Sequence, residues 1–305
     1  MKAYKTIFPF STTKEIPDDI KERLDGHAFS ELKDGQTKSS GFALLTESDR
    51  FIHSDNRYLF HYCEQMRKAD TNTVRHIFNE RLRKVEDEGR ELTEELREEL
   101  QAVAEREATR FATIKHSGVY ILFDAPAGRV WCAGSTIKKC ETALKRLRRA
   151  LGSLDTEPVI LTFASRRLAR LISSGHLRAH DNLRVPEYAK VVATDSDDSA
   201  SARMTFEGIS LHEASVGEVL TDRMVSAVEM DLIQPDPNGG KAQLLASFVL
   251  KAPESAGVSL SGMWYAGGAS ASETEENHAS DMQIAAKTCQ QIMAELSGFM
   301  QRGDL

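Results

Sequence analysis

Cysteine, long apolar stretches and recognisable catalytic signatures are all scarce in this sequence of 305 residues. Its four cysteines are scattered without a Cys-x-x-Cys pair, which argues against a disulfide framework and a structural zinc site. No apolar run approaches the roughly 18 residues of a membrane-spanning helix. The opening MKAYKTIFPF lacks the apolar core of a secretory signal. These absences predict a cytoplasmic globular protein with reduced thiols.

Signatures of catalysis and metal binding are also missing. The chain contains no GxxxxGK[ST], HExxH or GxSxG motif. His176 and His180 stand four residues apart, but Gly175 is placed to end a helix just before them, which disfavours a metal site on one helix face. The acidic run at 195–198 lacks the glycine and closing glutamate of a calcium loop. We therefore expect no catalytic residue, no metal site and no cofactor.

Charge is distributed unevenly along this acidic chain, whose formal net charge is -7. Residues 86–107 hold ten acids and three arginines. Residues 129–184 hold twelve Lys/Arg and four acids, and residues 185–305 hold eighteen acids and seven bases. A basic middle region of this kind can bind a polyanion locally. Folding could equally mix these segments and dilute the field.

Hydrophobic periodicity indicates a mixed α+β chain with four regions, at 1–72, 73–112, 113–185 and 186–305. The first is an α/β region containing a β-hairpin around Ser54-Asp55-Asn56, and the second is a helical hairpin broken near Gly89. The third starts with a β-hairpin, followed by a helix for which Ser135 is the expected N-cap.

Later in the third region, PVILTF has the composition of an apolar strand, and ASRRLARLISSG that of a short helix. The last region reads as an antiparallel β-meander and a terminal helix from about Asp281 to Met300. The expected fold class is therefore α+β, with several subdomains that carry antiparallel sheets and one helical hairpin.

The segment IKKCETALKRLRRALGSL, residues 137–154, carries the clearest signal. Its apolar residues follow helical steps of three and four along one face: Ile137, Cys140, Leu144, Leu147 and Leu151. Five cations fall on the opposite face: Lys138, Lys139, Lys145, Arg146 and Arg149. Solvated helix faces often alternate charge signs, whereas this face has no acid at its centre. A polyanion site and a solvated helix back remain about equally good interpretations of the periodicity.

A second basic helix follows, with Arg166, Arg167 and Arg170 in SRRLARL. Neither helix belongs to a zinc-finger or helix-turn-helix pattern. If these helices bind nucleic acid, contact with phosphates without sequence readout is the natural inference.

Two runs in the middle of the chain resemble a known family. The helix pair of residues 81–111, which ends in Arg106, Arg110 and Phe111, is followed by the β-hairpin and a helix with paired lysines that ends in Leu-Gly-Ser-Leu. This order resembles the recombination-associated RdgC family, most specifically over residues 73–154. Near the N-terminus, Glu15-Ile16 and Gly41-Phe42 match the same family pattern, although the prolines expected after Gly41-Phe42 are missing.

The resemblance implies a horseshoe-like protomer that forms a ring-shaped homodimer around double-stranded DNA. It further implies DNA binding with little sequence preference, association with the nucleoid and restraint of RecA-dependent recombination. An exonuclease label has also been attached to this family. The family's interface aromatic is replaced near Ala108, although Phe111 is retained, and Arg203 remains from its basic strand. These residues are the expected dimer contacts and an additional DNA contact.

We therefore expect a non-enzymatic DNA-binding homodimer that modulates RecA, with RecA itself as a possible partner. The expected DNA contacts are Lys138, Lys139, Lys145, Arg146, Arg149, Arg166, Arg167, Arg170 and Arg203. Two alternatives stay open. One is a metal-dependent DNA exonuclease, which would need clustered carboxylates. The other is a regulator that binds the recombinase through acidic surfaces.

Overall fold

The computed structural model of the chain describes residues 4–33, 35–195, 202–266 and 275–303. It confirms the α+β class, because one 14-stranded sheet and seven α-helices make up the described part. All pairings between its named strands are antiparallel. The main path of the sheet runs β11-β10-β12-β13-β14-β1-β6-β5-β4-β2.

The strands are β1 (Thr6–Thr12), β2 (Lys38–Phe42), β3 (Phe51–Ser54), β4 (Arg57–Arg67), β5 (Ile114–Asp124), β6 (Arg129–Ala133), β7 (Thr156–Pro158), β8 (Arg178–His180), β9 (Leu183–Arg184), β10 (Val191–Thr194), β11 (Arg203–Phe206), β12 (Met224–Gln234), β13 (Gln243–Lys251) and β14 (Ser259–Tyr265). The helices are α1 (Ile20–Asp25), α2 (Thr71–Asp87), α3 (Glu94–Phe111), α4 (Ile137–Leu151), α5 (Ala164–Ser173), α6 (Ala214–Thr221) and α7 (Glu275–Gln301), with the short 3-10 turn η2 (Ala125–Ala127).

The expected subdomains share this one sheet. Strand β1 pairs with β6 and β7, which come from the middle of the chain, and with β14, which lies near the end of the chain. The N-terminal strand therefore joins the two halves of the sheet. Separate antiparallel sheets, which the sequence suggested, are replaced by a continuous one.

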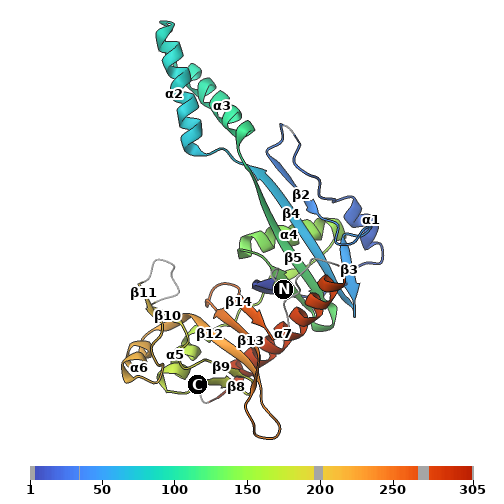
Figure 1. Cartoon of the computed structure of the whole chain (residues 1–305), viewed down its shortest axis with the longest axis vertical. Coiled ribbons are helices and arrows are strands. Elements are labelled where there is room, and N and C mark those ends of the chain that lie inside the picture. Colours follow the sequence, from blue (N-terminus) through green and yellow to red (C-terminus); the bar gives the residue numbers. More distant parts are fainter. Residues whose placement is uncertain (1–3, 34, 196–201, 267–274, 304–305) are drawn as a thin grey trace.

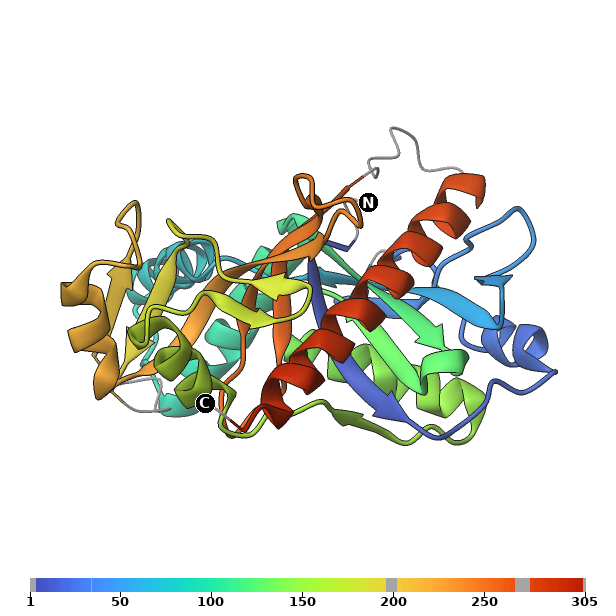
Figure 2. The same ribbon diagram turned by 90° about the horizontal axis from the view of Figure 1, so that it is seen from below.

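Alternating side chains divide the core into two layers. In β6, Val130 and Cys132 belong to the cluster under α1 and α4, whereas Trp131 and Ala133 belong to the cluster under α5, α6 and α7. Because successive residues of a strand point to opposite faces, these helices cover opposite faces of the sheet. Figure 2 shows α7 crossing the second face diagonally. We call the first the α4 face and the second the α7 face.

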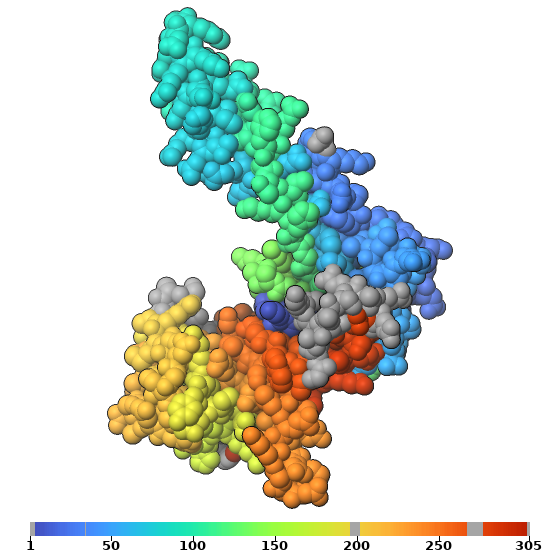
Figure 3. Space-filling model, viewed as in Figure 1, coloured from blue at the N-terminus to red at the C-terminus, as the bar shows by residue number. Residues whose placement is uncertain are grey.

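The helical hairpin projects away from the sheet. Strands β4 and β5 pair along their whole lengths, from Arg57↔Asp124 to Arg67↔Ile114, and lead into α2 and α3. Asp70 caps α2 and Thr93 caps α3 through their side-chain oxygens. Figures 1 and 3 show a hollowed side of the molecule between this hairpin and the part formed by β10, β11 and α6. We refer to it as the recess.

Several local expectations are confirmed. The β3–β4 turn uses Asp55 and Asn56, both with positive φ, as a tight hairpin of this twist requires. Gly175 follows α5 with φ +74 and donates its N–H to the Ile172 carbonyl. The meander β12-β13-β14 is also present.

Three expectations are wrong in detail. PVILTF is not a strand beyond Pro158, because β7 ends there and Ile160 and Phe163 are exposed. Thr136, not Ser135, caps α4. The terminal helix begins at Glu275, before Asp281.

Candidate nucleic-acid interface

Helix α4 docks on the sheet through its apolar face, as its periodicity predicts. Thr136 Oγ1 accepts a hydrogen bond from the main-chain N–H of Lys139 at 3.3 Å and so starts the helix. Its buried face consists of Cys140, Ala143, Leu144, Leu147, Ala150 and Leu151. Each leucine buried in this way stabilises the docked helix by about 1.5–3 kcal/mol.

Glycine and arginine fix the two ends of α4. A Cβ on Gly134 would stand 2.8 Å from Cys140 Sγ, so the absence of a side chain lets the end of β6 approach the helix closely. At the other end, Arg23 of α1 donates from Nη1 to the Leu151 carbonyl oxygen at 2.6 Å. Because α1 lies away from the recess, the N-terminal end of α4 points toward it (Figure 1).

The outer face of α4 carries cations that lack acidic partners. Lys138, Lys139, Lys145 and Arg149 are exposed, and Arg146 is half-buried. Among the described residues, none of the five has a carboxylate within the 4.0 Å that defines an ion pair. Arg148, by contrast, lies 3.8 Å from Asp155. We call these five residues the α4 cation row.

A further cation near the start of α4 could not be found from the sequence. Lys5 is exposed and lines a depression of about 400 Å3 together with Gly134 and Ser135, which immediately precede α4. Lys5 is distant from α4 in the chain and reaches it only because β1 pairs with β6. It extends the positive surface at the recess end of the helix.

The arginines of α5 do not continue the α4 cation row. Helix α5 packs in the cluster of the α7 face, opposite to α4. Arg166 pairs with Glu254 at 3.2 Å. Arg167 donates to the carbonyl oxygens of Phe299 and Arg302 and lies over the Phe299 ring, 5.8 Å from its centroid. The two basic helices therefore lie on opposite faces of the sheet, and of the three arginines of α5 only Arg170 is exposed without an ion pair among the described residues. The expected DNA contacts of these arginines stay a prediction.

The remaining expected contacts lie elsewhere. Arg203 is exposed on β11, at the edge of the sheet and beside the recess. Phe111, at the end of α3, is 78% exposed and lines a cleft of about 950 Å3 with Arg67, Arg106 and Arg110. Ala108 is 2% exposed inside the helical hairpin. Ala108 packs within the hairpin in the single chain, and its expected contact with a second chain stays a prediction.

Within the ranges that the structure describes, no group of three or more His, Cys, Asp or Glu is placed to hold a metal ion. His180 Nδ1 lies 2.7 Å from a Glu295 oxygen, while His176 Nδ1 lies by Ser174, so the two imidazoles do not converge. In the acidic run at 195–198, residues 196–198 fall outside the described part. No described helix is long and apolar enough to cross a membrane.

Comparison with known protein families supplies the deciding observation. The family model described as "Putative exonuclease, RdgC" matches residues 3–212, which is well over half of the chain. The chain belongs to the RdgC family. The match covers α4 and the helical hairpin, as the resemblance predicted, and ends shortly before α6. A search among curated proteins found no match.

Proposed function

We propose that this RdgC-family protein binds double-stranded DNA through its phosphates, with little sequence preference. The observation that carries the proposal is the α4 cation row, five cations none of which has a carboxylate within 4.0 Å among the described residues. Phosphate oxygens would satisfy guanidinium and ammonium donors that the protein leaves to solvent. Lys138 and Lys139 lie at the recess end of the helix, where the hollowed side of the molecule could accept a duplex.

The proposal includes a homodimer that closes into a ring, with each protomer contributing a horseshoe-like half. An exposed Phe111 beside a large cleft suits a contact between chains, because buried aromatic residues commonly dominate interfaces. In this arrangement the protein would act in the cytoplasm on the nucleoid and restrain RecA-dependent recombination by occupying DNA. Light scattering of the purified chain tests the dimer, and a monomer would contradict the ring.

The DNA contact is tested by reversing two charges of the α4 cation row. Lys138→Glu/Lys145→Glu should weaken duplex binding and reduce the salt dependence, because each neutralised phosphate contributes a slope of about −0.9 in log K against log salt. The matched control is Lys241→Glu/Lys287→Glu, which makes the same change in net charge on a loop and on α7. Equal affinity and salt slope for the two variants would exclude α4 from the DNA site.

The description of the family model names an exonuclease, so a second candidate function is a DNA exonuclease. Metal-assisted hydrolysis needs carboxylates gathered around one or two cations, and the described residues contain no such cluster. The test is incubation of end-labelled duplex with the pure protein and Mg²⁺ or Mn²⁺. Degradation that co-purifies with the protein would establish the nuclease.

A third candidate is a regulator that binds RecA directly through its acidic surfaces, for which α3 offers Glu94, Glu95, Glu98 and Glu99 as exposed carboxylates. The Lys138→Glu/Lys145→Glu variant separates this candidate from the main proposal. Inhibition of RecA that persists in this variant would favour direct binding, whereas loss of inhibition together with DNA affinity would favour occupation of DNA.

A further inference from the structure

A groove in the C-terminal half of the sheet lies far from α4. It has a volume of about 570 Å3 and lies beside β8, β9 and the β12–β13 loop. Six of its nine lining residues are aliphatic or proline, among them Leu177, Pro186, Ile233 and Pro235. Arg178 and Arg184 supply the positive charge. We call it the Arg178 groove.

The two arginines stand directly opposite each other on β8 and β9. Like charges in this position repel across a strand pair. Arg184 is compensated by Asp231 of β12, at 3.3 Å. Arg178 is not, since its Nη2 donates to the main-chain oxygen of Asp181 at 2.7 Å and no described carboxylate lies within ion-pair distance. The groove therefore holds an exposed guanidinium without a counter-charge.

The groove is held in place by the surrounding main chain. Val185 N–H donates to the Leu177 carbonyl at 2.7 Å, and Ile233 N–H donates to the Asn182 carbonyl at 2.8 Å. Arg302, just after α7, donates from Nη1 to the carbonyl oxygens of Arg178 and Ala179, both at 3.0 Å. These bonds fix β8 on both of its sides. A ligand would thus meet a preformed surface and cost little ordering of the protein.

Carboxylates near the groove are already engaged with protein donors. Asp231 accepts from Ser247 Oγ at 2.7 Å in addition to its pairing with Arg184. Glu187 accepts a hydrogen bond from Ser210 Oγ at 2.8 Å. Neither is placed against the Arg178 guanidinium as an ion pair. Among the described residues, no carboxylate is thus available to pair with Arg178, and an acidic group of a bound partner would complete the charge balance there.

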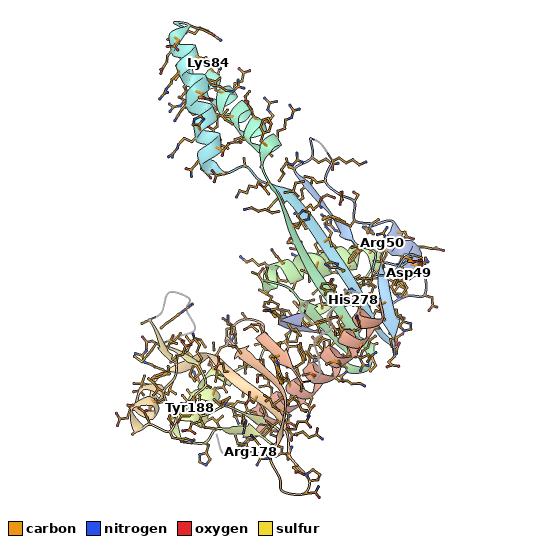
Figure 4. All side chains as sticks on the ribbon, in the orientation of Figure 1. Asp49, Arg50, Lys84, Arg178, Tyr188 and His278 are labelled. Atoms are coloured by element: carbon orange, nitrogen blue, oxygen red, sulfur yellow. The ribbon has the colours of Figure 1, made fainter. Side chains whose placement is uncertain are left out.

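We propose that the Arg178 groove binds a short acidic peptide segment of a partner protein. A carboxylate of the segment pairs with the Arg178 guanidinium, whose planar donors fit carboxylate geometry. A neighbouring aliphatic side chain of the segment lies against Pro186, Ile233 and Pro235. An apolar floor with a charged rim matches such a mixed peptide better than a phosphate backbone, which offers no apolar group. Figure 4 shows Arg178 low in the C-terminal half, well away from the recess, so the site is independent of the proposed DNA contact.

Fluorescence anisotropy with a labelled peptide, Gly-Asp-Glu-Asp-Leu-Ile-Gly, tests the proposal on the full chain. Arg178→Ala should weaken binding about tenfold, the usual effect of losing one charge-assisted hydrogen-bonding partner. Ala242→Phe, which fills the groove and leaves both arginines in place, should weaken it at least as much. Lys287→Glu, on the exposed side of α7, should leave the affinity unchanged. Circular dichroism of each variant checks that the fold is intact.

Two altered peptides separate the charged contact from the apolar one. Replacing the acids by Asn and Gln should remove binding, and replacing Leu and Ile by Ser should weaken it to a similar degree. The proposal is overturned if the parent peptide does not bind, or if Arg178→Ala and Ala242→Phe bind it as well as the unmodified chain. It is also overturned if short duplex DNA displaces the peptide and loses affinity in Arg178→Ala, since the groove would then be a phosphate site.

Discussion

Helices α4 and α5 have the same design in sequence but different roles in the fold. Both are amphipathic, both bury an apolar face, and both carry arginines on the opposite face. The five residues of the α4 cation row have no carboxylate within 4.0 Å among the described residues, whereas Arg166 and Arg167 of α5 bond to Glu254 and to the end of α7. A basic helix face is therefore evidence for polyanion binding only when the tertiary structure leaves its charges uncompensated.

The largest effect should come from substitutions in the buried apolar face that each of the two helices has. Leu147 and Leu168 are 0% and 1% exposed, respectively. Leu147→Ala and Leu168→Ala should each lower the free energy of unfolding by about 2–5 kcal/mol, because each leaves a cavity in a packed core. Urea unfolding measures both. Exposed Lys145→Ala is the control and should change the stability by less than about 0.5 kcal/mol. A small effect in only one helix would show that its docking is loose.

Charge reversals on the exposed faces should then distinguish the two helices by their effect on duplex affinity. Lys139→Glu/Arg149→Glu in α4 should reduce duplex affinity by roughly a hundredfold, about tenfold for each reversed contact. Arg166→Glu/Arg170→Glu in α5 should change it by less than about threefold, because α5 lies on the opposite face of the sheet. Titrations of the same labelled duplex at one salt concentration provide the measurement. Equal losses would indicate that DNA contacts both faces.

A smaller difference is expected between two arginines of α5 itself. Arg167→Ala removes hydrogen bonds to the Phe299 and Arg302 carbonyls and should lower the free energy of unfolding by about 1–3 kcal/mol. Arg170→Ala should have an effect within about 0.5 kcal/mol, because the side chain is exposed. Urea unfolding of both variants decides the point. If the two substitutions prove equivalent, the anchoring role of Arg167 is refuted.

The smallest effect concerns pH and the Glu295 carboxylate beneath β8 and β9. Burial by itself raises the pKa of Glu295, but hydrogen bonds from the Asn182 main chain, His180 and the Asn182 side chain outweigh it, so that the pKa is lowered. A lowered folded-state pKa stabilises the protein above the ordinary glutamate value of about 4.3, and this contribution is lost as pH falls through the folded-state value.

Glu295→Gln should therefore be less stable than the unmodified chain at neutral pH, and the difference should shrink below about pH 4. Thermal melts of both proteins across this range measure it. A stability difference that is independent of pH would mean that the Glu295 charge does not contribute.

Local features of the fold could be predicted because local chemistry dictates them. The Asp55-Asn56 turn, the break of the helical hairpin near Gly89 and the apolar stripe of α4 each depend on residues close together in the chain. The prediction of a strand over PVILTF was wrong for a non-local reason. After Pro158, Val159 bonds to both Pro9 and Val258 through the main chain, and the segment then turns outward to expose Ile160 and Phe163 before α5. Apolar composition alone does not show whether partner strands are present.

The residues of the candidate site likewise fall into those that could be predicted from the sequence and those that could not. The α4 cation row could be identified from helical periodicity, since it depends only on spacing within one helix. Lys5 could not, because it reaches α4 through the pairing of β1 with β6. The hydrogen bond from Arg167 to the Phe299 carbonyl could not be predicted either, because the end of α7 lies more than a hundred residues later in the chain. The burial of Ala108, an expected dimer contact, depends on the packing of α2 against α3 and could not be predicted either.

By itself, the sequence determined the helical hairpin, the β3–β4 hairpin, the meander, the apolar face and cation row of α4, and membership of the RdgC family. These follow from spacing and residue type within short segments. Only the tertiary structure decided that one sheet joins all the regions, that α4 and α5 lie on opposite faces, and which cations remain without a counter-charge among the described residues. Those outcomes depend on contacts between segments that are distant in the chain, because strand pairing, helix packing and ion pairing between such segments are not visible in local residue spacing.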